Sequence, residues 1–182
     1  MSIKMFLICL SIIIFSSCNY NSPSESQNLQ TRTKPSVLKK YYLKRPNYKL
    51  EYYSNWKIDS ADIDFDIDTY FTLNSSDESS IIFFIFNTEV DAKEYVDKQV
   101  KAHLEKIVKG GKVTYFTDWG RYKGYGANIN GKFLGIYNGE IKFFCNSTDS
   151  NSFLMISQLF ESDRAKDESC LKLIETSFKI NQ

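Results

Sequence analysis

The chain has 182 residues, and its 23 Lys and Arg nearly balance its 22 Asp and Glu, for a formal net charge of +1. Nucleic-acid-binding domains normally carry a clear basic excess, so this balance argues against that class. It also argues against electrostatic attraction as the main mode of membrane attachment. Apolar residues make up 42% of the chain and aromatic residues 15%, which suffices for a packed core and favours a sheet-rich fold.

Residues 1–17 have the pattern of an export signal. One lysine precedes a nearly unbroken apolar run from Met5 to Phe15. The run is shorter than the roughly 20 residues that cross a bilayer, and it has the size of a signal-peptide core. Two serines then precede Cys18. The segment resembles the lipobox of bacterial lipoproteins, with Phe15 in place of the usual leucine. That resemblance implies removal of residues 1–17 and acylation of Cys18; an ordinary signal peptide or an uncleaved anchor is the alternative.

Residues 19–36 are rich in Ser, Asn, Gln, Thr and Pro and contain almost no large apolar side chains. Such a segment cannot bury enough apolar surface to offset the entropy cost of ordering it. We therefore expect residues 18–47 to be a lipidated cysteine followed by a flexible polar tether. Residues 48–182 are expected to form a single globular domain.

The end of this tether, from Val37 to Pro46, is distinctly basic. Its lysines and arginine interleave with Tyr41, Tyr42 and Leu43. The stretch could contact lipid headgroups or an acidic partner. We favour the simpler interpretation, in which it is a solvated lead-in to the first strand.

The first part of the domain has strand patterns. Ile63, Phe65 and Ile67 alternate with aspartates, which is typical of a half-buried strand. The continuous apolar run Ile81 to Phe86 predicts a central strand covered on both faces. We expect strands at residues 49–53, 63–67 and 81–86, while residues 69–73 extend the second of these strands or begin the next one.

A helix is expected next, capped at its start by Thr88, with Asp91 completing a weak capping box. Gly110 and Gly111 are expected to end it, because glycine readily adopts the left-handed conformation at a helix C-terminus. One face of this segment is apolar, as an amphipathic helix requires. That face comprises Ala92, Tyr95, Val96, Val100, Leu104, Ile107 and Val108.

Four strands are expected at residues 112–119, 122–129, 132–137 and 140–146. Asn-Gly pairs at 130–131 and 138–139 separate three of them, and Asn-Gly between strand-like runs predicts a tight hairpin turn. A further strand at 152–161 precedes a last helix at 164–176, with Ser162 or Asp163 as its cap and Leu171, Ile174 and Phe178 on its buried side. The order predicts an α+β domain built on an antiparallel sheet with flanking helices.

This layout resembles the PsbP-like fold, an α/β/α sandwich that also occurs in DcrB-like bacterial envelope lipoproteins. The resemblance runs from about Tyr52 to Ile180. It begins with the aromatic-turn-Trp sequence from Tyr53 to Trp56 and closes with the pair Ser177-Phe178. The resemblance implies binding and assembly roles rather than one chemistry, so it does not fix a function.

No recognised catalytic motif is present in the sequence. The aspartates at 62, 64, 66 and 68 place Ile67 and Leu73 where a calcium-binding EF-hand loop needs Gly and Glu. A charged edge strand is the favoured interpretation, and a divalent cation bridging two of the aspartates is the alternative. His103 is the only histidine; without a second ligand or a nucleophile motif, we interpret it as a helix-surface residue. We expect neither an enzyme nor a cofactor.

Two further features invite a function. Trp119, Arg121, Tyr122 and Tyr125 could form an aromatic-basic binding patch, although packing within the sheet is the favoured explanation. Cys145 and Cys170 remain in the domain after export to an oxidising space, where a pair often forms a disulfide. We slightly favour the disulfide over two buried free thiols.

These features predict a non-enzymatic lipoprotein of the cell envelope that binds a protein partner or acts as an assembly or accessory factor. An inhibitor or immunity lipoprotein belongs to the same class. A module that binds a small ligand or a glycan is the alternative. Asn19 differs from the Asp that directs inner-membrane retention in enteric bacteria, which favours the periplasmic side of an outer membrane.

Overall fold

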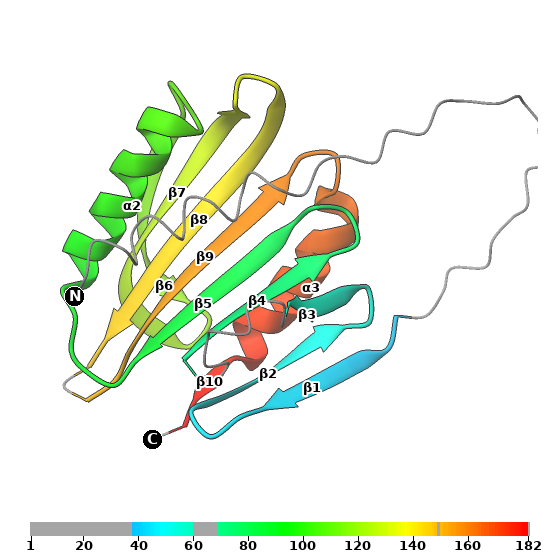
Figure 1. The fold of residues 1–182 in the computed structure, drawn as a ribbon, viewed down its shortest axis with the longest axis vertical. Helices are drawn as coiled ribbons and strands as arrows, with labels where there is room; N and C mark the ends of the chain where they lie inside the picture. The colour runs from blue at the N-terminus through cyan, green and yellow to red at the C-terminus, as the bar shows by residue number, and fades with distance from the viewer. Residues whose placement is uncertain (1–37, 60–68, 149, 182) are drawn as a thin grey trace, which may run out of the picture. The chain divides into compact units, whose positions relative to one another are not determined.

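A computed structural model of the chain describes residues 38–59, 69–148 and 150–181. Ten strands and two helices lie in this part of the chain (Figure 1). The strands are β1 (Lys40–Lys44), β2 (Tyr48–Tyr53), β3 (Trp56–Asp59), β4 (Tyr70–Ser75), β5 (Ser80–Phe86), β6 (Lys112–Trp119), β7 (Tyr122–Phe133), β8 (Tyr137–Ser147), β9 (Ser152–Phe160) and β10 (Lys179–Ile180). The helices are α2 (Ala92–Lys106) and α3 (Arg164–Ser177).

Seven of these strands form one antiparallel sheet in the order β3-β4-β5-β9-β8-β7-β6, and β1, β2 and β10 form a separate small sheet. Helix α2 packs against one face of the large sheet, while α3 and the small sheet lie on the other (Figure 1). The predicted α+β fold, an antiparallel sheet with flanking helices, is confirmed. No helix among the described residues has the length and apolarity needed to cross a bilayer.

The core on the α3 side is built from stacked aromatic rings. Phe83 and Phe178 lie with ring centroids 4.5 Å apart, and Tyr48 stacks on Phe71 at 4.3 Å. All four side chains are buried. Each contributes roughly 1.5–3 kcal/mol of apolar burial, so this cluster holds the small sheet, α3 and the large sheet together.

Strand β5 confirms the expected central strand. Ile81, Phe83 and Ile85 belong to the core cluster on the α3 side, and the alternate residues pack against the cluster on the α2 side. Successive strand residues point to opposite faces, so a continuous apolar run is required wherever both faces are covered.

The two predicted Asn-Gly turns are wrong, because both pairs lie inside strands. Gly131 of β7 is directly opposite Gly139 of β8. A Cβ atom on Gly131 would lie 2.6 Å from Cγ1 of Val108, and one on Gly139 would lie 2.8 Å from the carbonyl oxygen of Leu159. These glycines permit close packing within the fold, and the turn between β7 and β8 falls at residues 134–136 instead.

Helix α2 begins later than predicted. Its N-cap is Asp91, whose side chain accepts a hydrogen bond from the Glu94 amide at 2.9 Å. The carbonyl of Thr88, the predicted cap, instead accepts from the Ser152 hydroxyl at 2.7 Å. The helix ends at Lys106, and Gly110 follows with a φ of 71°.

Helix α3 lies close to its predicted position, and Asp163 is its N-cap without a side-chain hydrogen bond. Ile174 and Phe178 are buried as expected, while Leu171 is only partly buried. The basic stretch predicted as a lead-in forms strand β1. The signal segment, Cys18, the tether to residue 37 and the acidic segment 60–68 lie outside the described residues.

Candidate functional site

The predicted aromatic-basic patch does not come together on one surface. Trp119 is only 4% exposed and packs in the core on the α3 side, 5.7 Å from the ring of Phe178. Tyr122 is partly buried in the same cluster. Tyr125 packs against the other core cluster, on the α2 side of the sheet. Arg121 donates to the carbonyl of Thr176 at 3.3 Å, so packing explains the residues that suggested a binding site.

The expected disulfide is not formed. Cys145 and Cys170 are free and buried, and they belong to core clusters on opposite faces of the large sheet. Burial raises the pKa of the Cys145 thiol to about 12 and that of Cys170 to about 11. Thiols with such pKa values stay protonated at neutral pH, which is the state of an unreactive buried cysteine.

The prediction that His103 lies on the helix surface is wrong, because it is only 6% exposed. Its Nδ1 lies 2.7 Å from the carbonyl oxygen of Gln99, and its ring makes an edge contact with Phe143 at 4.9 Å. A carbonyl only accepts, so Nδ1 carries a proton and donates this hydrogen bond. Burial lowers the pKa of His103, which favours the neutral ring.

The described surroundings of His103 are a backbone carbonyl and an aromatic ring. Among the described residues, no group of three or more His, Cys, Asp or Glu side chains could hold a metal ion. With its Nδ1 bound to the backbone and its ring against Phe143, His103 has a packing role.

Two shallow hollows occur on the described surface. One, of about 460 Å³, lies along α2 and is lined by ion pairs such as Lys98 with Glu94. The other, of about 270 Å³, lies near Arg121 and Lys123. Lys123 is paired with Asp118, and Asn146 donates to the Lys123 carbonyl at 2.7 Å. Both hollows are shallow and lined largely by charged and polar residues, whereas small-ligand sites are mostly apolar clefts.

The turn between β7 and β8 is the most unusual surface. Leu134 is 69% exposed, Ile136 68% and Tyr137 60%. We call these three residues the hairpin tip; it lies at the top of Figure 1, far from the small sheet. Exposed apolar side chains gathered in this way mark sites of interaction with other proteins.

The backbone of the hairpin tip is held in place. The Leu134 amide donates to the carbonyl of Ile107, the C-cap residue of α2, at 2.7 Å. Phe133, directly before the tip, is buried with its ring 5.1 Å from that of Phe160. The tip is therefore anchored to both α2 and β9.

Leu134 also adopts a φ of 48°, in the left-handed region. A Cβ atom makes that region costly, by roughly 1–2 kcal/mol, and Gly or Asn normally occupies it. The sequence did not reveal this site, because residues 132–137 matched a strand pattern. The available signal was the three large apolar residues around Gly135, which begin three residues after Gly131.

Comparison with protein-family models and with curated proteins finds no match, whereas solved structures do match. LpqN of Mycobacterium tuberculosis, described as involved in cell envelope biogenesis, shares 8% identity over 80% of this chain and 92% of its own, with a TM-score of 0.51. Cyanobacterial PsbP from Synechocystis shares 8% identity over 85% of this chain and 98% of its own, with a TM-score of 0.46.

A Bacteroides thetaiotaomicron protein shares 11% identity over 79% of this chain, with a TM-score of 0.48. The chain spans about half of that protein, 48% of its length. At such low identities the similarity to LpqN shows a shared α+β fold and nothing about function.

Proposed function

We propose that the protein is a lipid-anchored, non-enzymatic accessory protein of the bacterial cell envelope that binds a protein partner through the hairpin tip. The observation that carries this proposal is the exposure of Leu134, Ile136 and Tyr137, each at least 60% accessible, on one anchored turn. Export and anchoring rest on the apolar segment before Cys18. LpqN, with the same fold, is described as an envelope biogenesis protein, which agrees with that location.

The conformation of Leu134 supports a role in binding. A water-exposed leucine gains little from burial, and its positive φ costs free energy that Gly or Asn would avoid. Strained residues of this kind persist mainly at functional positions. A rigid tip also loses little conformational entropy when a partner binds it, which favours affinity.

The partner surface is an apolar groove that accepts a leucine and an isoleucine, with a polar group near the Tyr137 hydroxyl. Tyr137 presents both an aromatic ring and a hydroxyl, the combination enriched at protein interfaces. Buried apolar anchors at the centre of an interface dominate its binding energy.

The test is quantitative co-purification of the full-length protein from its native envelope. The double variant Leu134→Asn/Ile136→Asn should lose a stoichiometric partner that the wild type retains. The matched control is Tyr115→Asn, which removes an apolar side chain of comparable exposure, 56%, from strand β6. A partner lost equally in the control, or retained by the tip variant, would overturn the proposal.

A further inference from the structure

The small sheet carries an unusual row of lysines. Lys44 of β1 is directly opposite Lys49 of β2, and Lys49 is directly opposite Lys179 of β10. None of the three forms an ion pair with any residue that the structure describes. Like charges directly opposite one another destabilise a sheet, so this row of three lysines costs stability without an internal compensation.

All three lysines share the face of the small sheet that points away from the core. Leu43 and Leu50, the neighbouring cross-strand pair, are buried on the opposite face. We call the outward face the lysine face. Its strands β1, β2 and β10 also place Lys40, Tyr42 and Glu51 there by alternation.

The lysine face is strongly cationic. Its four lysines stand against one glutamate, Glu51, which pairs with Lys40 at 3.6 Å. Tyr42, in the middle of β1, is 59% exposed. Tyrosine with lysine is the combination found at the headgroup level of membranes, where the ring is partly embedded and the ammonium groups meet phosphate.

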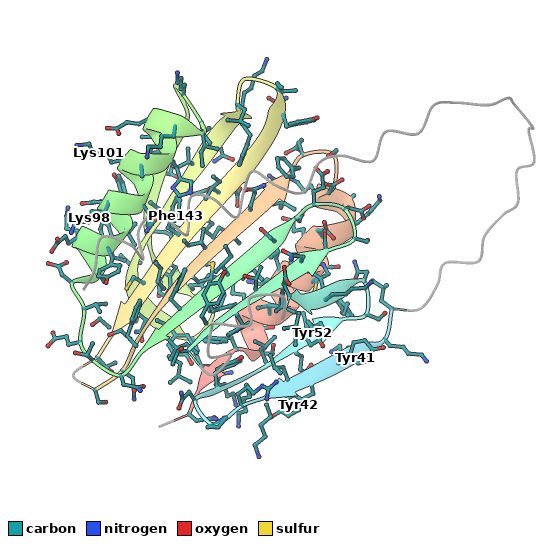
Figure 2. The ribbon with its side chains drawn as sticks, in the orientation of Figure 1. Tyr41, Tyr42, Tyr52, Lys98, Lys101 and Phe143 are labelled. Atoms are coloured by element: carbon teal, nitrogen blue, oxygen red, sulfur yellow. The ribbon has the colours of Figure 1, made fainter. Side chains whose placement is uncertain are left out.

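The lysine face includes β1, the first described strand after Cys18 in the sequence. Strand β1 begins at Lys40, and the intervening chain of about 22 residues can span at most about 75 Å. A lipid on Cys18 would therefore keep the lysine face within reach of the bilayer at a high effective concentration. Figure 2 shows Tyr42 on the opposite side of the domain from Lys98 and Lys101 of α2.

We infer that the lysine face docks on anionic phospholipid headgroups and orients the domain on its membrane. The inference rests on the proposed lipid anchor, which supplies attachment, while the lysine face supplies orientation. Phosphate groups neutralise the row Lys44, Lys49 and Lys179, which has no partner within the described protein. In this orientation the hairpin tip, distant from the small sheet in Figure 1, points away from the bilayer and is free to meet a partner.

The experiment is amine-acetylation footprinting of the full-length lipoprotein by mass spectrometry. The protein is reconstituted in vesicles of phosphatidylcholine alone or of phosphatidylcholine with phosphatidylglycerol. Acetylation of Lys44, Lys49 and Lys179 should slow by about three-fold or more on the anionic vesicles and recover at about 1 M salt. Acetylation of Lys101 and Lys109, exposed on and after α2, should not change.

Equal acetylation on both vesicles would overturn the inference, as would equal protection of the lysines on the α2 side. The triple variant Lys44→Gln/Lys49→Gln/Lys179→Gln should lose the salt-sensitive protection at Lys40. The matched variant Lys101→Gln/Lys106→Gln/Lys109→Gln should keep it.

The two proposals fail separately. Flotation with vesicles of phosphatidylcholine alone reports the lipid anchor, because such vesicles carry no net charge. A protein that floats with them but shows no charge-dependent protection has the anchor and not the orienting face. A protein that floats only with anionic vesicles, and only with the three lysines intact, has the face and not the anchor.

Discussion

Replacing the strained leucine of the hairpin tip should stabilise the fold while abolishing partner binding. Leu134 has a φ of 48°, a conformation that costs a residue with a Cβ atom roughly 1–2 kcal/mol. Asn tolerates this region because its short polar side chain bonds locally. The backbone bond from the Leu134 amide to Ile107 does not involve the side chain, so Leu134→Asn retains it.

The expected change in the free energy of unfolding combines the apolar burial lost and the backbone strain relieved. Leu134 is 69% exposed, so truncating it forfeits only about a third of a full burial term, or about 0.6 kcal/mol. Relief of the backbone strain outweighs this loss and leaves a net gain of about 0.5 kcal/mol. At about 2–4 °C per kcal/mol for a domain of this size, the melting temperature should rise by about 1–2 °C.

Ile136→Asn is the matched control. Ile136 is 68% exposed and does not have a positive φ, so the same change forfeits the same burial without relieving strain. The free energy of unfolding, measured in urea on the full-length protein, should be about 1 kcal/mol higher for Leu134→Asn than for Ile136→Asn. If Leu134→Asn is as destabilising as the control, the strain argument is refuted.

Three further predictions concern the core and the small sheet. Burial lowers the pKa of His103, so the unfolded state binds more protons below its ordinary value near 6.5. The free energy of unfolding should therefore decrease as the pH is lowered there, by up to about 1.4 kcal/mol per pH unit, and urea titrations of His103→Gln should lack this slope. Burial and the raised thiol pKa values protect Cys145 and Cys170 from alkylation. The native acylated protein should therefore not be alkylated, and the unfolded protein should show two free thiols. A disulfide between Cys145 and Cys170 would leave no free thiol after unfolding, and an unacylated Cys18 would add a third free thiol. Lys49→Glu, placed between two cross-strand lysines, should raise the free energy of unfolding by about 1 kcal/mol; a lower urea midpoint would contradict the pairing.

Local periodicity predicted the elements whose burial is local. The apolar run of β5 and the stripe of α2 were found because alternation and helical spacing express which side faces the core. The Asn-Gly pairs misled because a long-range contact overrides the turn preference: Gly131 has no room for a side chain beside Val108.

The site could not be predicted for similar reasons. The Leu134 amide, at a residue with positive φ, bonds to Ile107 at the end of α2, a long-range contact that no local pattern records. His103 is buried beside Phe143, whereas the lack of a second ligand or a nucleophile motif had suggested a helix-surface residue. The lysine row appears only once three strands far apart in sequence are placed in register.

The central claim is that the hairpin tip binds a protein partner in the envelope. It is tested most directly by placing a photo-crosslinking amino acid at Ile136, and separately at Tyr115 on β6 as the control, in the full-length protein in living cells. The account predicts one dominant protein adduct from position 136 that is absent from position 115 and is lost when Leu134→Asn is introduced. The absence of any protein adduct at position 136, or the same adducts from both positions, would contradict it.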